Sequence, residues 1–322
     1  MTARVARAAV AAAWLLAAAA GASAQPQPAA PAPAASEPAV TDTIAQLRRR
    51  GSIVIGHREA AVPFSYLVEG QPRGYAIDLC MQVVEGLKRR LSLPALKVQW
   101  VRLQAAERVP AVQSGRVDLE CGNTTATADR RKQVAFSTPT FIAGAGVLVR
   151  SDIAGKAAAS FTLRELRGKR VVVASGTTGE KIVNRANEAL HGLLPVLVKD
   201  NAEAFALLES GKADAWITDD ILLAAYRAQS ADPTRYVLLD KRHTIEPLAL
   251  MHRKDDPAFE RAVDAEVAQL FRSGLVQLLY RRWFQQPVPP RNVNLDLPPS
   301  RLLKEIFRTP LKMQYEVDII VL

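Results

Sequence analysis

Polar side chains that can bind a small charged molecule stand at the ends of several predicted strands. They are His57, Arg58, Glu107, Arg108, Asn123, Thr124, Thr125 and Arg130, followed later in the chain by residues 175–178, Asn201, Asp219 and Asp220. An arginine guanidinium suits two-point contact with a carboxylate, N–H groups at a helix start favour an anion, and a lone aspartate suits an ammonium group. Together these groups match the parts of an amino acid.

The elements that must position these residues alternate between strand and helix patterns. Residues 52–56 form an apolar run ended by a glycine, which predicts a buried strand, and apolar residues recur at helical spacing from Ile77 to Leu91. Further strands are predicted over 98–103, 116–121, 170–174, 194–198 and 213–218, and helices over 179–190 and 202–210. A capping box at Thr162 and Glu165 predicts one more short helix. This alternation predicts an α/β fold with sheets flanked by helices.

The same pattern occurs twice, which predicts two lobes. Residues 113–119 and 209–215 both have a helix end, a glycine, a basic residue and then a strand that carries an aspartate. Because the helical stretch 257–284 needs a sheet to pack on, we expect it to return to the first lobe. Lobe one is therefore expected over 41–145 and 246–322, and lobe two over 146–245. Two chain crossings between the lobes predict a hinge.

The two ends of the chain differ from the predicted lobes. Residues 1–24 have the pattern of a secretory signal peptide cleaved after Ala24, and residues 25–40 are a tether rich in Pro and Ala. Cleavage lowers the formal charge from +10 to +8. No later window is apolar enough for a membrane span, and export to the periplasm argues against a nucleic-acid partner. The helix expected over 300–307 packs on lobe one, and the apolar end 317–322 has no assigned role.

Several short motifs resemble the periplasmic glutamate/aspartate-binding proteins, which are family 3 solute-binding proteins of ABC transporters. They are Gly56-His-Arg-Glu59, Pro63-Phe-Ser-Tyr66, Arg108-Val-Pro110, Glu120-Cys-Gly-Asn-Thr-Thr125, Ala135-Phe-Ser137 and Ser175-Gly-Thr-Thr178. The likeness runs from about residue 41 to 290. It implies a type II periplasmic-binding-protein fold, with a mixed sheet in each lobe, that closes around one dicarboxylic amino acid. It also implies a monomer that delivers its ligand to an inner-membrane ABC permease.

The resemblance also implies a role for each residue that faces the backbone groups of the ligand. The arginine that matches Arg130 holds the α-carboxylate, and the hydroxyl groups that match Thr125 and Thr178 assist it. The aspartate that matches Asp219 takes the α-ammonium group.

The side-chain carboxylate of the ligand faces the arginines that match Arg58 and Arg108. Three positions depart from the family pattern: Ala105 replaces a serine, Asn123 replaces a serine, and Asn201 stands where a histidine assists recognition. An asparagine can still donate a hydrogen bond to a carboxylate, but a cationic contact is lost. The choice between glutamate, aspartate and an amide analogue therefore stays open.

Two other classes of function compete with binding and transport. An enzyme on the same fold, such as a periplasmic cyclohexadienyl dehydratase, needs an acid placed for proton transfer, and a hydrolase needs a nucleophile with a base. Ser175 lacks a Gly-x-Ser-x-Gly context, and the four histidines are scattered. A sensor domain is the third class. We expect no enzyme activity, no cofactor and no metal site, since the two Cys and four His show no ligand spacing.

The two cysteines, Cys80 and Cys121, lie on a predicted helix and a predicted strand of the same lobe. In an oxidising compartment such a pair favours a disulfide, and the alternative is two buried thiols.

Overall fold

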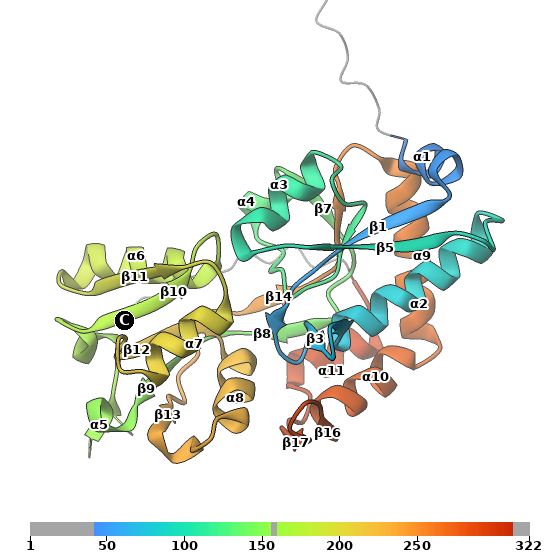
Figure 1. The fold of residues 1–322 in the computed structure, drawn as a ribbon. Helices are drawn as coiled ribbons and strands as arrows, with labels where there is room; N and C mark the ends of the chain where they lie inside the picture. Colours follow the sequence, from blue (N-terminus) through green and yellow to red (C-terminus); the bar gives the residue numbers. More distant parts are fainter. Residues whose placement is uncertain (1–41, 156–159, 312–322) are drawn as a thin grey trace, which may run out of the picture. The chain divides into compact units, whose positions relative to one another are not determined.

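The computed structural model describes residues 42–155 and 160–311 (Figure 1). The predicted signal peptide, the predicted tether and the apolar end 317–322 lie outside the described residues. Among the helices of the described ranges, none is long and apolar enough to cross a bilayer.

The first sheet has five strands in the order β5-β1-β6-β15-β7. These are β1 (Ser52–His57), β5 (Lys97–Arg102), β6 (Leu119–Glu120), β7 (Val134–Phe136) and β15 (Met251–Arg253). β1 is parallel to β5 and β6, and β15 runs antiparallel to β6 and β7, so the sheet is mixed. β6 is shorter than the strand predicted over 116–121, and Asp118, just before it, accepts from the backbone N–H of Val54 and from the side chain of Arg50.

The helices of this sheet come from both ends of the chain. They are α1 (Thr43–Arg50), α2 (Tyr75–Arg90), α3 (Arg108–Gln113), α4 (Ala128–Arg131), α9 (Pro257–Arg272), α10 (Leu275–Phe284) and α11 (Arg301–Arg308). The single helical stretch expected over 257–284 is two helices, because Gly274 adopts a left-handed conformation with φ of 73°. Four aromatic side chains pack together in the hydrophobic core formed with these helices: Phe64, Tyr75, Phe141 and Phe284.

The second sheet has five strands in the order β11-β10-β12-β9-β13. These are β9 (Ala145–Arg150), β10 (Arg170–Ala174), β11 (Leu194–Val198), β12 (Ala215–Asp219) and β13 (Tyr236–Leu238). Its helices are α5 (Ser151–Ala154), α6 (Thr178–Leu190), α7 (Asn201–Glu209) and α8 (Asp220–Gln229). The predicted capping box of Thr162 and Glu165 is present, but it opens a single 3₁₀ turn (Leu163–Leu166).

Two short strands carry the chain between the sheets. β8 (Phe141–Ala143) leaves the first sheet, β14 (Glu246–Leu248) returns to it, and they pair antiparallel, with Glu246 opposite Ala143. We call the first sheet with its helices lobe one, the second sheet with its helices lobe two, and the β8–β14 pair the crossing. Small sheets of β2 (Ala60–Ala61), β3 (Ser65–Val68) and β4 (Gln71–Arg73), and of β16 (Pro287–Val288) and β17 (Val293–Asn294), complete the fold.

Cys80 of α2 and Cys121 after β6 form a disulfide, with their Cα atoms 6.2 Å apart. This confirms the pairing predicted from the sequence. Both cysteines are fully buried. The bond joins α2 to the segment that follows β6, which leads directly to Asn123 and Thr125.

Removing the disulfide with the double substitution Cys80→Ala and Cys121→Ala is expected to lower the free energy of unfolding by about 4 kcal/mol. The bond links residues 41 positions apart in the sequence. In the chain-entropy model, closing a loop of that size lowers the entropy of the unfolded chain, which stabilises the folded state by about 4 kcal/mol. Urea unfolding of the oxidised protein and the variant measures the difference. Equal midpoints would contradict the expectation, and a reducing agent should leave the variant unaffected.

Candidate ligand-binding site

The structure brings all eight predicted binding residues to one cavity between the two lobes. The residues that line it are Arg58, Arg108, Asn123, Thr125 and Arg130 from lobe one, and Thr177, Thr178, Asn201, Thr218 and Asp219 from lobe two. Thr177 and Thr218 are additions to the predicted set. That these residues contact a ligand stays a prediction.

The strand ends explain why residues so far apart in the sequence meet here. Arg58 directly follows β1, Asp219 is the last residue of β12, and Thr178 begins α6 after β10. In open α/β sheets, ligands bind at the carboxyl ends of the parallel strands. Both sheets therefore present these ends to the same cavity.

Arg58 and Arg108 are almost completely buried and are held by protein groups on one side. Arg58 Nη2 donates to Asp200 Oδ1 of lobe two at 2.6 Å, and Arg108 donates to the carbonyl oxygen of Ala105 and to Thr124 Oγ1 at 2.9 and 2.8 Å. Burial is the main cause that lowers the pKa of Arg108, and the charges of Arg58 and Arg130 act in the same direction. Lobe one alone therefore holds the guanidinium of Arg108, whereas that of Arg58 is held by a partner from lobe two.

Arg130 lies on α4 and spans the two lobes. Its Nη1 donates to the carbonyl oxygen of Thr125 at 3.0 Å, and its Nη2 donates to that of Gly176 at 2.9 Å. Gly176 has φ of +75°, and a Cβ atom there would lie 2.7 Å from Cα of Ala106 in lobe one. Only glycine fits this close approach between the lobes.

Buried carboxylates stand beside the arginines. Asn123 Nδ2 donates to Asp219 Oδ2 at 2.9 Å, and burial followed by the neighbouring charge of Glu246 raises the pKa of Asp219 to about 8. Burial also raises the pKa of Glu120, while the charge of Arg108 opposes this shift. Two acids therefore lie beside the arginines, but their burial favours the neutral form of both, so the site is positive near neutral pH.

Asp200 and Glu246 are two acids of the site that the sequence analysis missed. Asp200 pairs with Arg58 across the lobes and also caps α7, where it accepts from the backbone N–H of Asn201. Glu246 begins β14 in the crossing, away from the predicted strand ends, and accepts hydrogen bonds from Thr125 and Thr178. Asp200 can be found from its position beside the predicted Asn201, whereas no local pattern marks Glu246.

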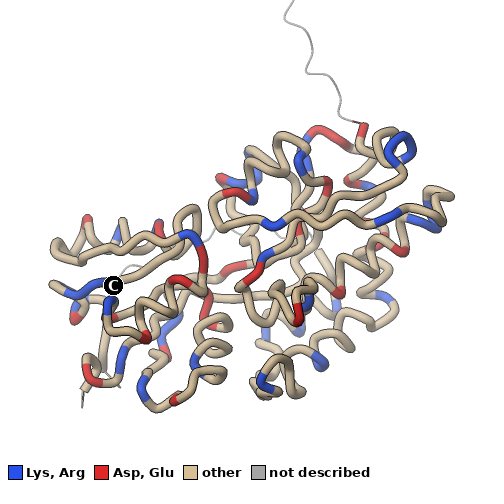
Figure 2. The backbone as a smooth tube through the Cα atoms, viewed as in Figure 1, with Lys and Arg blue, Asp and Glu red and all other residues tan. Residues whose placement is uncertain are grey.

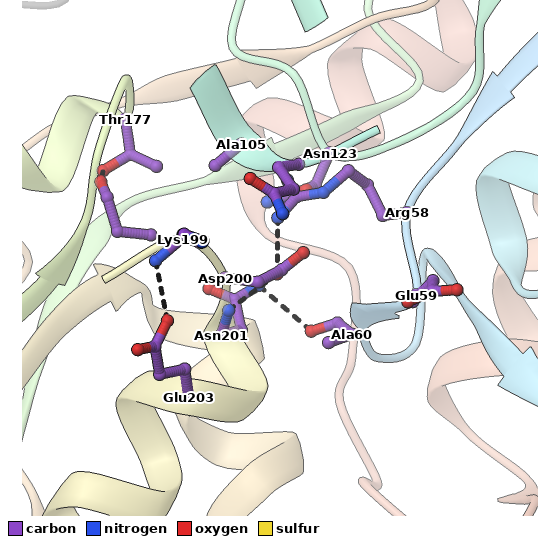
Figure 3. A network of polar contacts seen from close by, with 12 residues as sticks. Arg58, Glu59, Ala60, Ala105, Asn123, Thr177, Lys199, Asp200, Asn201 and Glu203 are labelled. Carbon is purple, nitrogen blue, oxygen red and sulfur yellow. Dashed lines mark hydrogen bonds and ion pairs between the residues drawn. The ribbon is translucent and has the colours of Figure 1, made fainter. Parts of the chain in front are cut away.

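Figure 3 shows the network that joins the lobes around Arg58. Arg58 reaches toward Asp200, and Asn201 Nδ2 donates to the carbonyl oxygen of Ala60 at 3.1 Å. The hydroxyl group of Tyr226 donates to the same carbonyl oxygen at 2.9 Å. Asn201 therefore contributes to contact between the lobes as well as lining the cavity.

Several polar residues that the sequence placed at strand ends do not line the cavity. Glu107 accepts from the backbone N–H of Gln104, and Asp220 pairs with Arg242 outside the cavity. The buried ring of His57 has its Nδ1 3.0 Å from the carbonyl oxygen of Arg58, and burial lowers its pKa. These side chains stabilise the ends of the elements on which the site is built.

Contacts across the cavity leave it a volume of about 10 Å³, close to the space of a single water molecule. Figure 2 shows Lys and Arg interspersed with Asp and Glu over both lobes. The positive formal charge is therefore spread along the chain, and the three arginines of the cavity are only a small part of it.

The structure has two lobes, each with a mixed sheet and flanking helices, and the chain passes between them twice, through β8 and β14. This architecture is that of a type II periplasmic binding protein, which confirms the predicted fold class. The chain belongs to the bacterial extracellular solute-binding proteins, family 3, whose model matches residues 53–286.

Among its relatives is the L-glutamate/L-aspartate-binding protein of Pseudomonas aeruginosa, which is 39% identical over 274 residues, or 84% of this chain and 89% of that protein. The glutamate/aspartate import solute-binding protein of Escherichia coli is 37% identical over 277 residues, or 85% of this chain and 89% of that protein. Both relatives are named as binding proteins.

Solved structures of amino-acid-binding proteins have the same fold. An ancestral arginine-binding protein bound to arginine has a TM-score of 0.65 and 28% identity, and the match covers 73% of this chain and 99% of that one. An ancestral amino acid-binding protein that is a precursor of cyclohexadienyl dehydratase has a TM-score of 0.64 and 31% identity, with 76% and 99% covered.

Proposed function

We propose that this chain is a periplasmic solute-binding protein that captures L-glutamate or L-aspartate by lobe closure and delivers it to an inner-membrane ABC permease. The observation that carries the proposal is the convergence of three arginines and Asp219 on one cavity between the lobes. The binding specificity in the names of the two relatives described above supports the same ligand class. No chemical change of the ligand is part of this function.

Each end of an acidic amino acid has a partner in the cavity. Arg130 takes the α-carboxylate and Asp219 takes the α-ammonium group, while Arg58 and Arg108 take the side-chain carboxylate. Asn123 and Asn201 supply amide groups near this end. A guanidinium that meets a carboxylate at two points gives both affinity and orientation.

Closure follows from the distribution of these contacts over both lobes. A ligand shifts an equilibrium between open and closed states only if it binds one state better than the other. Arg130 and Asp219 come from different lobes, so a ligand that touches both stabilises the closed state. The closed form is then the species that docks on the permease, and we infer that it does so as a monomer.

Calorimetry on refolded, ligand-free mature protein tests the assignment, with glutamate, aspartate, glutamine and leucine as ligands. The expected result is tight binding of one or both acids, weaker binding of glutamine and none of leucine. Absence of binding by either acid, or equal binding of leucine, would refute it.

Binding of glutamate is expected to release close to one proton per ligand at pH 6–7 and much less near pH 9. Asp219, whose pKa is about 8, is mainly protonated below that value, and it must ionise to pair with the ammonium group. The affinity is therefore expected to fall as the pH drops below about 8. Titrations at one pH in buffers of different ionisation enthalpy count the protons.

The Asp219→Asn variant is the control for this measurement, since it has no proton to release at that position. Proton release that is equal in wild type and variant would assign the release to another group.

A further inference from the structure

A second and larger cavity lies between the lobes, with a volume of about 330 Å³. We call it the rear cavity. Lobe two lines it mainly with α8 and the segment after β13, and lobe one lines it with α10 and the start of α11, next to β8 of the crossing. Small-molecule sites in proteins have volumes of roughly 300–1,000 Å³. The rear cavity therefore has the size of a binding site for a small molecule.

The rear cavity and the cavity of the candidate ligand-binding site lie on opposite sides of the crossing. Asp219 ends β12 and lines the ligand-binding cavity, and the next residue, Asp220, lines the rear cavity. In Figure 1, α8, α10 and α11 lie below β8, whereas α4 and α6, which carry Arg130 and Thr178, lie above it. A rotation of the lobes about the crossing that narrows one cavity therefore widens the other.

One wall of the rear cavity is apolar and well packed. The rings of Phe141 and Tyr280 are buried and stacked, with their centroids 5.9 Å and their planes 19° apart. The hydroxyl group of Tyr280 donates to the carbonyl oxygen of Leu297 at 3.3 Å, so its polar atom has a partner. Ile221 and Leu303 are also buried and line the same cavity. This wall can cover the apolar body of a small molecule.

The charged side chains of the rear cavity have one positive charge in excess. Arg227, Lys241 and Arg242 line it together with Asp220 and Asp240. Arg242 Nε donates to Asp220 Oδ2 at 2.5 Å, so the charges of this pair offset each other. The other two cations face only one further acid of the lining. Charge complementarity therefore favours a ligand with a single negative group.

We propose that the rear cavity binds a small aromatic carboxylate and that its occupancy stabilises the closed arrangement of the lobes. The apolar wall covers the ring, and Arg227 and Lys241 pair with the carboxylate. A molecule that contacts both lobes there opposes the rotation that would narrow the rear cavity and open the ligand-binding cavity. The coupling rests on the proposed capture of an amino acid by lobe closure. It is reciprocal, so each of the two molecules tightens the binding of the other.

Calorimetry with 3-phenylpropionate tests the proposal, with 3-phenylpropan-1-ol as the uncharged analogue of similar size. The wild-type protein without glutamate is expected to bind the carboxylate about fivefold more tightly than the alcohol, the contrast that exposed ion pairs give. Saturation with 3-phenylpropionate is expected to tighten glutamate binding by at least about fivefold.

The substitution Ala224→Trp places an indole ring in the rear cavity. Ala224 lies on α8 and lines this cavity. The variant is expected to lose at least about 10-fold in affinity for 3-phenylpropionate, because the ring occupies its space, and to bind glutamate more tightly without any addition. Ala189→Trp, at an exposed position of α6 in the same lobe, is the matched control and should leave both affinities unchanged.

The substitution Lys241→Ala tests the charge separately. It is expected to weaken 3-phenylpropionate and leave 3-phenylpropan-1-ol unchanged, and Lys212→Ala, another exposed lysine of lobe two, should affect neither. Since Lys241 is exposed, this pair of variants decides the matter if Ala224→Trp does not fold.

Four outcomes would overturn the proposal. They are absence of 3-phenylpropionate binding, equal binding of the alcohol, undiminished binding of 3-phenylpropionate by folded Ala224→Trp, and a glutamate affinity that 3-phenylpropionate leaves unchanged or lowers. A lowered affinity is expected if the added molecule enters the ligand-binding cavity instead. Failure of the wild-type protein to bind glutamate would refute the proposed function, whereas binding of 3-phenylpropionate is measured without glutamate.

Discussion

Replacing Arg130 with alanine is expected to abolish measurable binding of every amino acid, whatever its side chain. Arg130 is the one arginine of the cavity that donates to carbonyl groups of both lobes, and we assign it to the α-carboxylate that all amino acids share. Truncation of one partner in a desolvated charged pair costs about 4 kcal/mol, which corresponds to about 1,000-fold in affinity. Calorimetry with glutamate, aspartate and glutamine measures the loss.

Lys132→Ala is the matched control for this substitution. Lys132 directly follows α4 and is exposed, and it pairs with Asp129 on the surface. Its removal subtracts the same charge near the same place and should change the affinity by less than about threefold. If Arg130→Ala retained binding of glutamine, the assignment of Arg130 to the α-carboxylate would be wrong.

Replacing Arg58 with alanine is expected to weaken glutamate and aspartate by about 100-fold and to change glutamine binding much less. The substitution removes a cation from the side-chain end of the cavity, and it also leaves the carboxylate of Asp200 without its 2.6 Å partner. Both effects weaken binding of a ligand with a side-chain carboxylate, whereas the neutral amide of glutamine is affected much less. The ratio of the glutamate and glutamine dissociation constants is the measurement.

Two further variants separate the causes. Arg102→Ala removes an exposed arginine at the end of the neighbouring strand, paired with Glu59, and should leave the ratio unchanged. Arg58→Ala combined with Asp200→Asn should recover part of the glutamate affinity, because the unpaired carboxylate is gone. An equal loss for glutamate and glutamine in Arg58→Ala would exclude its role in selecting acidic ligands.

The strand ends of the site could be predicted because they follow from a local pattern. An apolar run that ends in a polar residue marks the point where a strand leaves a sheet, and this rule found Arg58, Asn123 and Asp219. The break between α9 and α10 was missed because apolar residues keep helical spacing across Gly274, and a glycine within such a pattern is often tolerated.

Glu246 could not be predicted for a different reason. Its partners Thr125 and Thr178 are 121 and 68 residues away along the chain, and it lies in a crossing rather than at a strand end. Asp200 stands beside the predicted Asn201 and caps α7, but nothing in the sequence shows that it also pairs with Arg58 of the other lobe. Contacts that arise only when two lobes meet leave no periodic signal in the sequence.

The return of β15, α9 and α10 to lobe one sets the order in which the two lobes can fold as the chain is synthesised. The strands of lobe two lie in one continuous stretch from β9 to β13, so this lobe can form as soon as that stretch is complete. The first sheet, by contrast, needs β15 between β6 and β7, and its core needs aromatic side chains from α10. Since long-range strand pairing waits for the later segment, lobe one completes its sheet only after β15 and α10 are available, and lobe two can be the first of the two to fold.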